Sequence, residues 1–194
     1  PSADLSLTQV KAEPIGEVQP RGTDLRLSAK VSGRVPESAV VMIRQTDGSE
    51  SVHSLKLPAG AKDTFPFPVR NLQHGFSYRF RAGDGQTPWH MIEVADRPAL
   101  KMVELVVIPP EYAKLSETRV TGLPKSTRVL QGSQLMLRLQ ASEPLKSLVL
   151  QGENNISIPL QQTQEGIYEW KAELAESWAF RPIMENARGL NNES

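Results

Sequence analysis

The sequence predicts an all-β protein made of two tandem antiparallel β-sandwiches, and three observations lead to this prediction. Apolar and polar residues alternate along short segments, turn residues separate these segments, and the two halves of the chain repeat a common order of features. No stretch keeps the apolar period of about 3.6 residues that an amphipathic helix requires. Fifteen prolines among the 194 residues agree with this fold class, because proline discourages long helices and is confined in sheets to edges and loops.

The clearest alternation lies in residues 24–32, where every second side chain is apolar, and residues 134–142 repeat it less regularly. This period of two is typical of a half-buried strand. Further strands are expected over residues 39–45, 51–57, 64–72, 76–82, 89–94, 100–108, 145–151, 156–162, 167–174 and 178–183. The expected core residues are Leu25, Leu27, Val31, Tyr78 and Phe80 in the first half and Leu135, Leu137, Leu148, Leu150 and Phe180 in the second.

The two halves share three spaced pairs of residues in the same order. Gly22 and Gly132 each stand three residues before a leucine, Leu25 or Leu135. The other pairs are Pro36 and Val40 matched by Pro144 and Leu148, and Leu72 and Tyr78 matched by Leu174 and Phe180. A shared order of this kind indicates a tandem repeat, with domains over residues 1–97 and 98–194.

The repeat also bears on the end of the second sandwich. In the first half the segment 89–94 follows a glycine-rich turn as the last strand, whereas residues 185–194 reach only the matching turn. We therefore expect the second sandwich to lack its last strand in this chain. The edge exposed in this way would be liable to pair with a neighbouring chain, for example in a crystal.

One spacing in the first half resembles the signature of fibronectin type III domains around their strands E and F. Leu72 precedes Tyr78 by six residues, and Phe80 and Ala82 continue the alternation. The resemblance implies an immunoglobulin-like or fibronectin-III-like sandwich in which Tyr78 is the corner tyrosine, with its hydroxyl capping nearby backbone. In the second half Phe180 has no hydroxyl, and Pro182 would remove a hydrogen bond from a central strand.

Three longer stretches are similar to repeats of large membrane-anchored proteins of unknown function from planctomycetes and related bacteria. The stretches are Gly33-Arg34-Val35-Pro36, then Asn71-Leu72-Gln73 with Phe76-Ser77-Tyr78 and Ala82-Gly83-Asp84, and Arg97-Pro98 leading to Pro109-Pro110-Glu111-Tyr112. The resemblance implies a larger, extracytoplasmic, membrane-anchored parent protein. It brings no activity that could be assigned to residues of this chain.

Composition excludes several classes of function. Lys plus Arg and Asp plus Glu both number 22, so the formal net charge is zero. The chain therefore has no overall positive electrostatic field that would attract nucleic acid. The absence of cysteine removes disulfides and thiolate chemistry. No apolar run approaches the roughly 20 residues of a membrane-spanning helix, so no membrane segment is expected within this chain.

No constellation of residues predicts catalysis, a cofactor or a metal. His53, His74 and His90 form no His-x-His or His-x3-His pair, so surface histidines explain them better. Asp84 lies in a Gly-Asp-Gly turn without the neighbouring carboxylates of a calcium loop, and Asp96 at the junction is equally isolated. No Gly-x-Ser-x-Gly motif occurs. We expect a protein that is not an enzyme.

Three tryptophans are the remaining candidates for a binding site. Trp170 and Trp178 flank the expected E–F corner of the second half and are assigned to the core, whereas Trp89 begins a strand beside polar residues. Trp89 is therefore the candidate for an exposed contact. The expected function is a structural or protein-interaction module with a protein partner, and the alternative is a carbohydrate-binding module that stacks sugars on aromatic rings.

Overall fold

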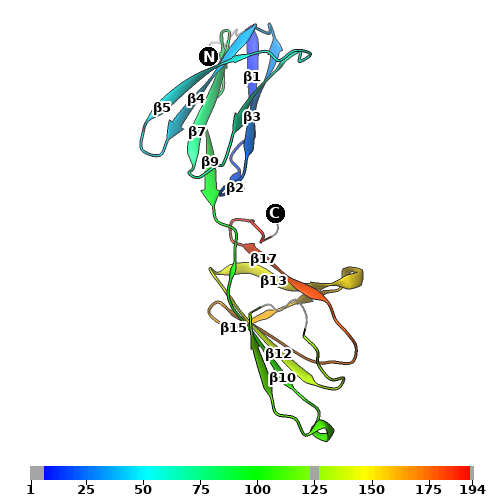
Figure 1. Ribbon diagram of the computed structural model, residues 1–194. Coiled ribbons are helices and arrows are strands. Elements are labelled where there is room, and N and C mark those ends of the chain that lie inside the picture. The colour runs from blue at the N-terminus through cyan, green and yellow to red at the C-terminus, as the bar shows by residue number, and fades with distance from the viewer. Residues whose placement is uncertain (1–6, 123–126, 193–194) are drawn as a thin grey trace, which may run out of the picture. The chain divides into compact units, whose positions relative to one another are not determined.

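The computed structural model describes residues 7–122 and 127–192 and divides the chain into two compact units, Pro1–Asp96 and Arg97–Ser194 (Figure 1). Two short 3-10 helices, Glu111–Ala113 and Glu153–Asn155, are the helical elements of the described residues. All other regular elements are strands, and the chain is an all-β protein. No helix in the described part is long and apolar enough to cross a membrane.

The first unit is a sandwich of two sheets. Its strands are β1 (Thr8–Glu13), β2 (Val18–Pro20), β3 (Leu25–Gly33), β4 (Ser38–Gln45), β5 (Glu50–Lys56), β6 (Thr64–Val69), β7 (Phe76–Ala82), β8 (Gly85–Gln86) and β9 (His90–Ala95). One sheet has the order β1-β3-β6 and the other β2-β9-β7-β4-β5, with β8 paired to β7. β1 therefore lies in the first sheet and β2 in the second. β2 runs parallel to β9, whereas the other strand pairs of this unit are antiparallel. This is an immunoglobulin-like arrangement.

Alternation along β3 and β7 builds the core of the first unit. All five residues that the sequence assigned to this core are buried, so the inward faces were predicted correctly. Tyr78 differs from the corner tyrosine that the resemblance implied. Its hydroxyl donates to the carbonyl oxygen of Pro14, 64 residues away between β1 and β2, and not to nearby backbone. The side chain therefore ties β7 to the point where the N-terminal strand changes sheets.

The second unit is also a two-sheet sandwich. Its strands are β10 (Leu100–Ile108), β11 (Thr118–Thr121), β12 (Gln134–Ala141), β13 (Leu145–Gly152), β14 (Ser157–Pro159), β15 (Gln161–Gln164), β16 (Ile167–Glu173) and β17 (Phe180–Asn186). The sheets have the orders β11-β10-β12-β16-β15 and β14-β13-β17. The single strand expected over residues 156–162 is two short strands in different sheets, because Leu160 turns inward between them and is buried.

Four of the five core residues predicted for this unit, Leu135, Leu137, Leu148 and Leu150, are buried. Phe180 is only partly buried against this core.

Backbone hydrogen bonds show which positions of the two units correspond. The Gly22 nitrogen donates to the Leu72 carbonyl over 2.7 Å, and the Gly132 nitrogen donates to the Leu174 carbonyl over 2.8 Å. The sequence repeat matched Gly22 with Gly132 and Leu72 with Leu174, and these bonds agree with both matches. The third pair is off by one residue, because Val40 faces outward whereas Leu148 is buried.

The turns after β7 and β17 also correspond. Thr87 donates its backbone N–H to the Phe80 carbonyl and accepts the Phe80 N–H on its hydroxyl. Asn192 makes the same two bonds with Met184, through its own N–H and its side-chain oxygen. Counting back from these bonds, Pro182 occupies the position of Tyr78, and Phe180 occupies that of Phe76. The sequence repeat matched Phe180 with Tyr78, and this match was wrong by two residues.

Pro182 removes no hydrogen bond from the β13–β17 pair, contrary to the expectation. The Met184 N–H points away from β13 toward Asn192, and the backbone of Pro182, two residues earlier, faces the same way. Within the described residues, β17 pairs with β13 on one side, and on the other side its backbone meets the short segment Leu190, Asn191 and Asn192. An edge position tolerates proline.

Candidate interaction surface

The outer face of the β9-β7-β4-β5 layer is the surface of the first unit that departs most from an ordinary solvated sheet. Because Ala39, Val41 and Ile43 are buried, the alternate residues of β4 point outward. Register then places Met42 opposite Val52 of β5 on one side and Arg79 of β7 on the other. We call this surface the outer face; its members are Val40, Met42, Arg44, Glu50, Val52, Ser54, Ser77, Arg79, Arg81, Trp89, Met91 and Glu93.

Trp89 lies directly before β9 and is held by two arginines. The guanidinium carbon of Arg44 is 4.3 Å from the centre of the Trp89 ring, and that of Arg79 is 4.8 Å away. Both distances are within the range of cation–π attraction. Trp89 is half-buried by these contacts, so its ring does not stand free in solvent.

The two arginines differ in their remaining partners. The Nε of Arg44 donates to the carboxylate of Glu50 over 2.7 Å, which offsets its charge. The Nε of Arg79 donates to the sulfur of Met42 over 3.3 Å, and no carboxylate of the described residues lies within ion-pair distance of it. Arg79 is half-buried. It is therefore a partly desolvated cation without a counter-charge.

Apolar side chains surround these arginines on the outer face. Val52 is 62% exposed and Met91 is 58% exposed, and Val40 and Met42 between them are half-buried. The solvent side of an antiparallel sheet is normally polar. Exposed apolar side chains gathered among charged ones are typical of a surface that binds another molecule.

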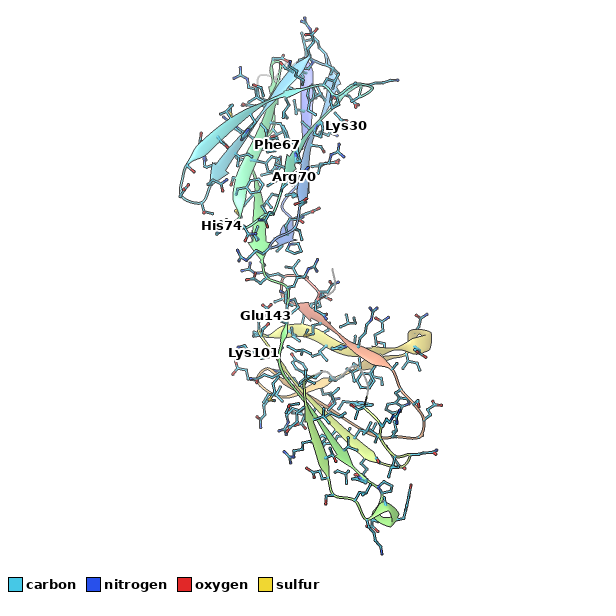
Figure 2. The ribbon with its side chains drawn as sticks, viewed as in Figure 1. Lys30, Phe67, Arg70, His74, Lys101 and Glu143 are labelled. Atoms are coloured by element: carbon cyan, nitrogen blue, oxygen red, sulfur yellow. The ribbon has the colours of Figure 1, made fainter. Side chains whose placement is uncertain are left out.

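The histidines and acidic residues weighed in the sequence do not assemble into a site. The His53 ring packs 4.9 Å from Phe67, the His90 ring lies 5.7 Å from Tyr78, and His74 is exposed in the turn before β7 (Figure 2). Among the described residues no group of three or more potential ligands could hold a metal ion.

Asp84 and Asp96 both accept hydrogen bonds from the first unit, Asp84 from backbone and Asp96 from a side chain. Asp84 accepts the backbone N–H of Leu7, and this bond together with the Thr8 hydroxyl lowers the pKa of the Asp84 carboxyl. Asp96 lies 2.6 Å from the Nε of Arg21, whose hydrogen bond lowers the pKa of the Asp96 carboxyl. These contacts account for both acids without a ligand.

The tryptophans of the second unit lie together at one end of its sandwich. The Trp170 ring is 5.2 Å from Trp178 and 5.6 Å from Phe180. Trp170 is half-buried against the core, but Trp178 is 39% exposed. The assignment of Trp178 to the core was therefore wrong, because this residue lies in the loop before β17 and remains exposed beside Trp170.

The sequence analysis predicts Trp89 as an exposed contact, whereas the structure places it half-buried against Arg44 and Arg79, two partners that the sequence did not indicate. The available signal was the pair Val40 and Met42, apolar residues at outward positions of an alternating strand. Arg44 and Arg79 gave no signal, because their approach to Trp89 depends on the register between β4, β7 and β9.

Neither a protein-family model nor a curated protein matches the chain. Among solved structures, the chain is similar to one described as a marsupial T cell receptor, at 14% sequence identity, over 86% of this chain and 88% of that one, with a TM-score of 0.38. The likeness is too distant to support any inference about function.

Proposed function

We propose that the chain is a non-catalytic protein-interaction module and that the outer face is its binding surface. The observation that supports this proposal is the gathering of apolar side chains on one solvent-facing sheet surface. Val52 and Met91 are exposed, and Met42 and Trp89 are half-buried on either side of Arg79. Removing such an area from water stabilises a complex by about 25 cal/mol per Å² of apolar surface, before the costs of association. A rigid sheet presents these side chains without ordering a loop.

A protein partner is favoured over the glycan alternative by the state of Trp89. Sugar stacking needs an aromatic ring that lies open and flat, and here two guanidinium groups pack against the ring. The exposed neighbours Val52 and Met91 offer no hydrogen-bonding groups for sugar hydroxyls. They are instead suited to the apolar side chains of another protein.

Photo-crosslinking of the chain as it exists tests the proposed surface. A benzophenone amino acid replaces Met91 on the outer face, and a matched variant carries it at Lys30, an exposed position on the outer side of β3 (Figure 2). We expect a defined protein adduct on intact source cells from the Met91 variant, and none from the Lys30 variant. Equal adducts at both positions, or none at Met91, would reject the outer face as the binding surface.

We further propose that residues 1–97 and 98–194 are separately folding modules of a larger extracytoplasmic, membrane-anchored protein. The buried apolar cluster of each half supports the first part, and the resemblance of its motifs supports the second. Each half produced alone should unfold cooperatively in urea. Antibody against the chain should label intact source cells; labelling only after permeabilisation would contradict the location.

A further inference from the structure

We propose that the partner presents a carboxylate side chain flanked by apolar residues, and that Arg79 is the anchor for that carboxylate. This inference rests on the proposed function of the outer face and adds the chemistry of what it binds. The partner is a protein segment, since its flanking groups have to cover Val52 and Met91.

The state of the Arg79 guanidinium supports the proposal. A guanidinium carries five N–H donors. The Nε–H of Arg79 is directed at the Met42 sulfur, a weak acceptor, and none of its other donors bonds to the described residues. A half-buried cation has lost part of its hydration, and a carboxylate that replaces the lost water stabilises the cation.

The surroundings of Arg79 hold the guanidinium in place for that contact. The Trp89 ring packs against it at 4.8 Å, and Met42 fixes its Nε from the neighbouring strand. An arginine held by its neighbours loses little side-chain entropy on binding, and its remaining N–H pairs match the two oxygens of a carboxylate. Arg79 is thus prepared for a bidentate ion pair.

The charges on the outer face favour an acidic group at Arg79 over other positions. Arg44 is already neutralised by Glu50, whereas Arg79 and the exposed Arg81, also on β7, have no ion-pair partner among the described residues. Glu93 is the carboxylate that follows Met91 outward on β9, and it forms no ion pair with either arginine. The surplus of positive charge is therefore centred on β7.

The spacing of the apolar groups sets the form of the ligand. Met91 lies on β9 beside β7, and Val52 lies on β5, two strands from β7 in the other direction. Neighbouring strands are about 4.8 Å apart, so apolar side chains roughly 5–10 Å on either side of the carboxylate would reach both. In an extended segment, residues two positions before and after the acid share its face at about this distance.

The test uses two peptides that differ in one group, acetyl-Leu-Ser-Glu-Ser-Leu-amide and its Gln counterpart. Binding to the full chain is followed by the NMR signal of the Trp89 indole N–H, identified by its loss in Trp89→Phe. Peptides are titrated into the natural chain, Arg79→Gln, Arg79→Lys and Arg26→Gln, where Arg26 is an exposed arginine of β3 on the other sheet. Circular dichroism confirms that each variant is folded.

We expect the Glu peptide to bind the natural chain and Arg26→Gln about tenfold more tightly than the Gln peptide does, as for a hydrogen-bonded ion pair. Arg79→Gln should abolish that difference and keep the weaker apolar binding, and Arg79→Lys should restore it in part because lysine cannot bind both oxygens.

Other results overturn the proposal in distinguishable ways. Equal affinity of both peptides for the natural chain removes the carboxylate anchor but leaves the outer face as an apolar binding surface. If neither peptide moves the Trp89 signal, both the anchor and the binding surface are wrong. If trigalacturonate moves the signal in an Arg79-dependent way and the Glu peptide does not, the ligand is an acidic glycan and the protein partner is rejected.

Discussion

Alkaline pH is expected to destabilise the first unit through one side chain, Tyr78. The tyrosine is fully buried between the sheets and donates its hydroxyl proton to the Pro14 carbonyl. Burial raises the pKa of Tyr78 to about 12, and the nearby charges of Glu13 and Glu17 act in the same direction. A phenolate could neither donate this hydrogen bond nor be hydrated in the core, so the folded state holds the proton.

The size and sign of the effect follow from the two pKa values. An unfolded chain loses this proton near pH 10, and each unit of difference corresponds to about 1.4 kcal/mol. Below about pH 10 both states keep the proton and the contribution of Tyr78 is complete. Between about pH 10 and 12 the unfolded state alone ionises, and on the order of 3 kcal/mol of stability is lost as the pH rises through the folded value.

The sequence provides a clean assay, because Trp89 is the one tryptophan of the first half and Tyr78 its one tyrosine. In a Trp170→Phe and Trp178→Phe background, Trp89 fluorescence follows the unfolding of the first unit alone. Urea titrations at pH 8, 10 and 11.5 then compare Tyr78 with Tyr78→Phe, which lacks the ionisable group. We expect the tyrosine form to lose more stability than the phenylalanine form above pH 10. Parallel losses in both forms would refute the reasoning.

Two further predictions concern the interiors of the sandwiches. Leu27→Ala and Leu137→Ala, both at buried positions, should each lower the free energy of unfolding in urea by about 2–5 kcal/mol; a cost near zero at both would contradict the assigned inward faces. Ser133 has a buried hydroxyl without a hydrogen-bond partner among the described residues, whereas Thr23, at the matching position, donates to the Pro20 carbonyl. Ser133→Ala should therefore cost little or stabilise, and Thr23→Val should cost about 1 kcal/mol; the opposite ranking in urea titrations would contradict the hydrogen-bond assignment.

Strands with a clear apolar pattern were predictable from the sequence. The bounds expected for Phe76–Ala82, which alternates, and for Leu100–Ile108, which ends in an apolar run, agree with the structure, because turn-forming residues follow both. β1, β2, β8 and β11 were not predicted. The shortest of these, Val18–Pro20 and Gly85–Gln86, are too short for a period to show. Val18–Pro20 pairs with the distant strand β9, and Gly85–Gln86 turns back onto β7, the strand directly before it.

The outer face was predictable only in part, for a different physical reason. A single aromatic residue beside polar neighbours drew attention to Trp89. Its cation–π contacts join side chains from β4 and β7 that are far apart in the sequence. Which outward residues meet across a sheet is decided by strand register, and register comes from the pairing of whole strands.

Comparison of the two units separates the residues that maintain the fold from those that we assign to binding. Val149 and Ile183 of the second unit stand opposite one another, as Met42 and Arg79 do in the first. Arg79 is thus replaced by an isoleucine, and Gln151 stands where Arg44 would be. Both units make the equivalent hydrogen bond, from Gly22 to Leu72 and from Gly132 to Leu174, because it joins two segments of the sandwich in each unit. The second unit does not share the paired arginines. This difference is expected if the outer face of the first unit serves recognition, because the packing of the sandwich does not require two cations against Trp89.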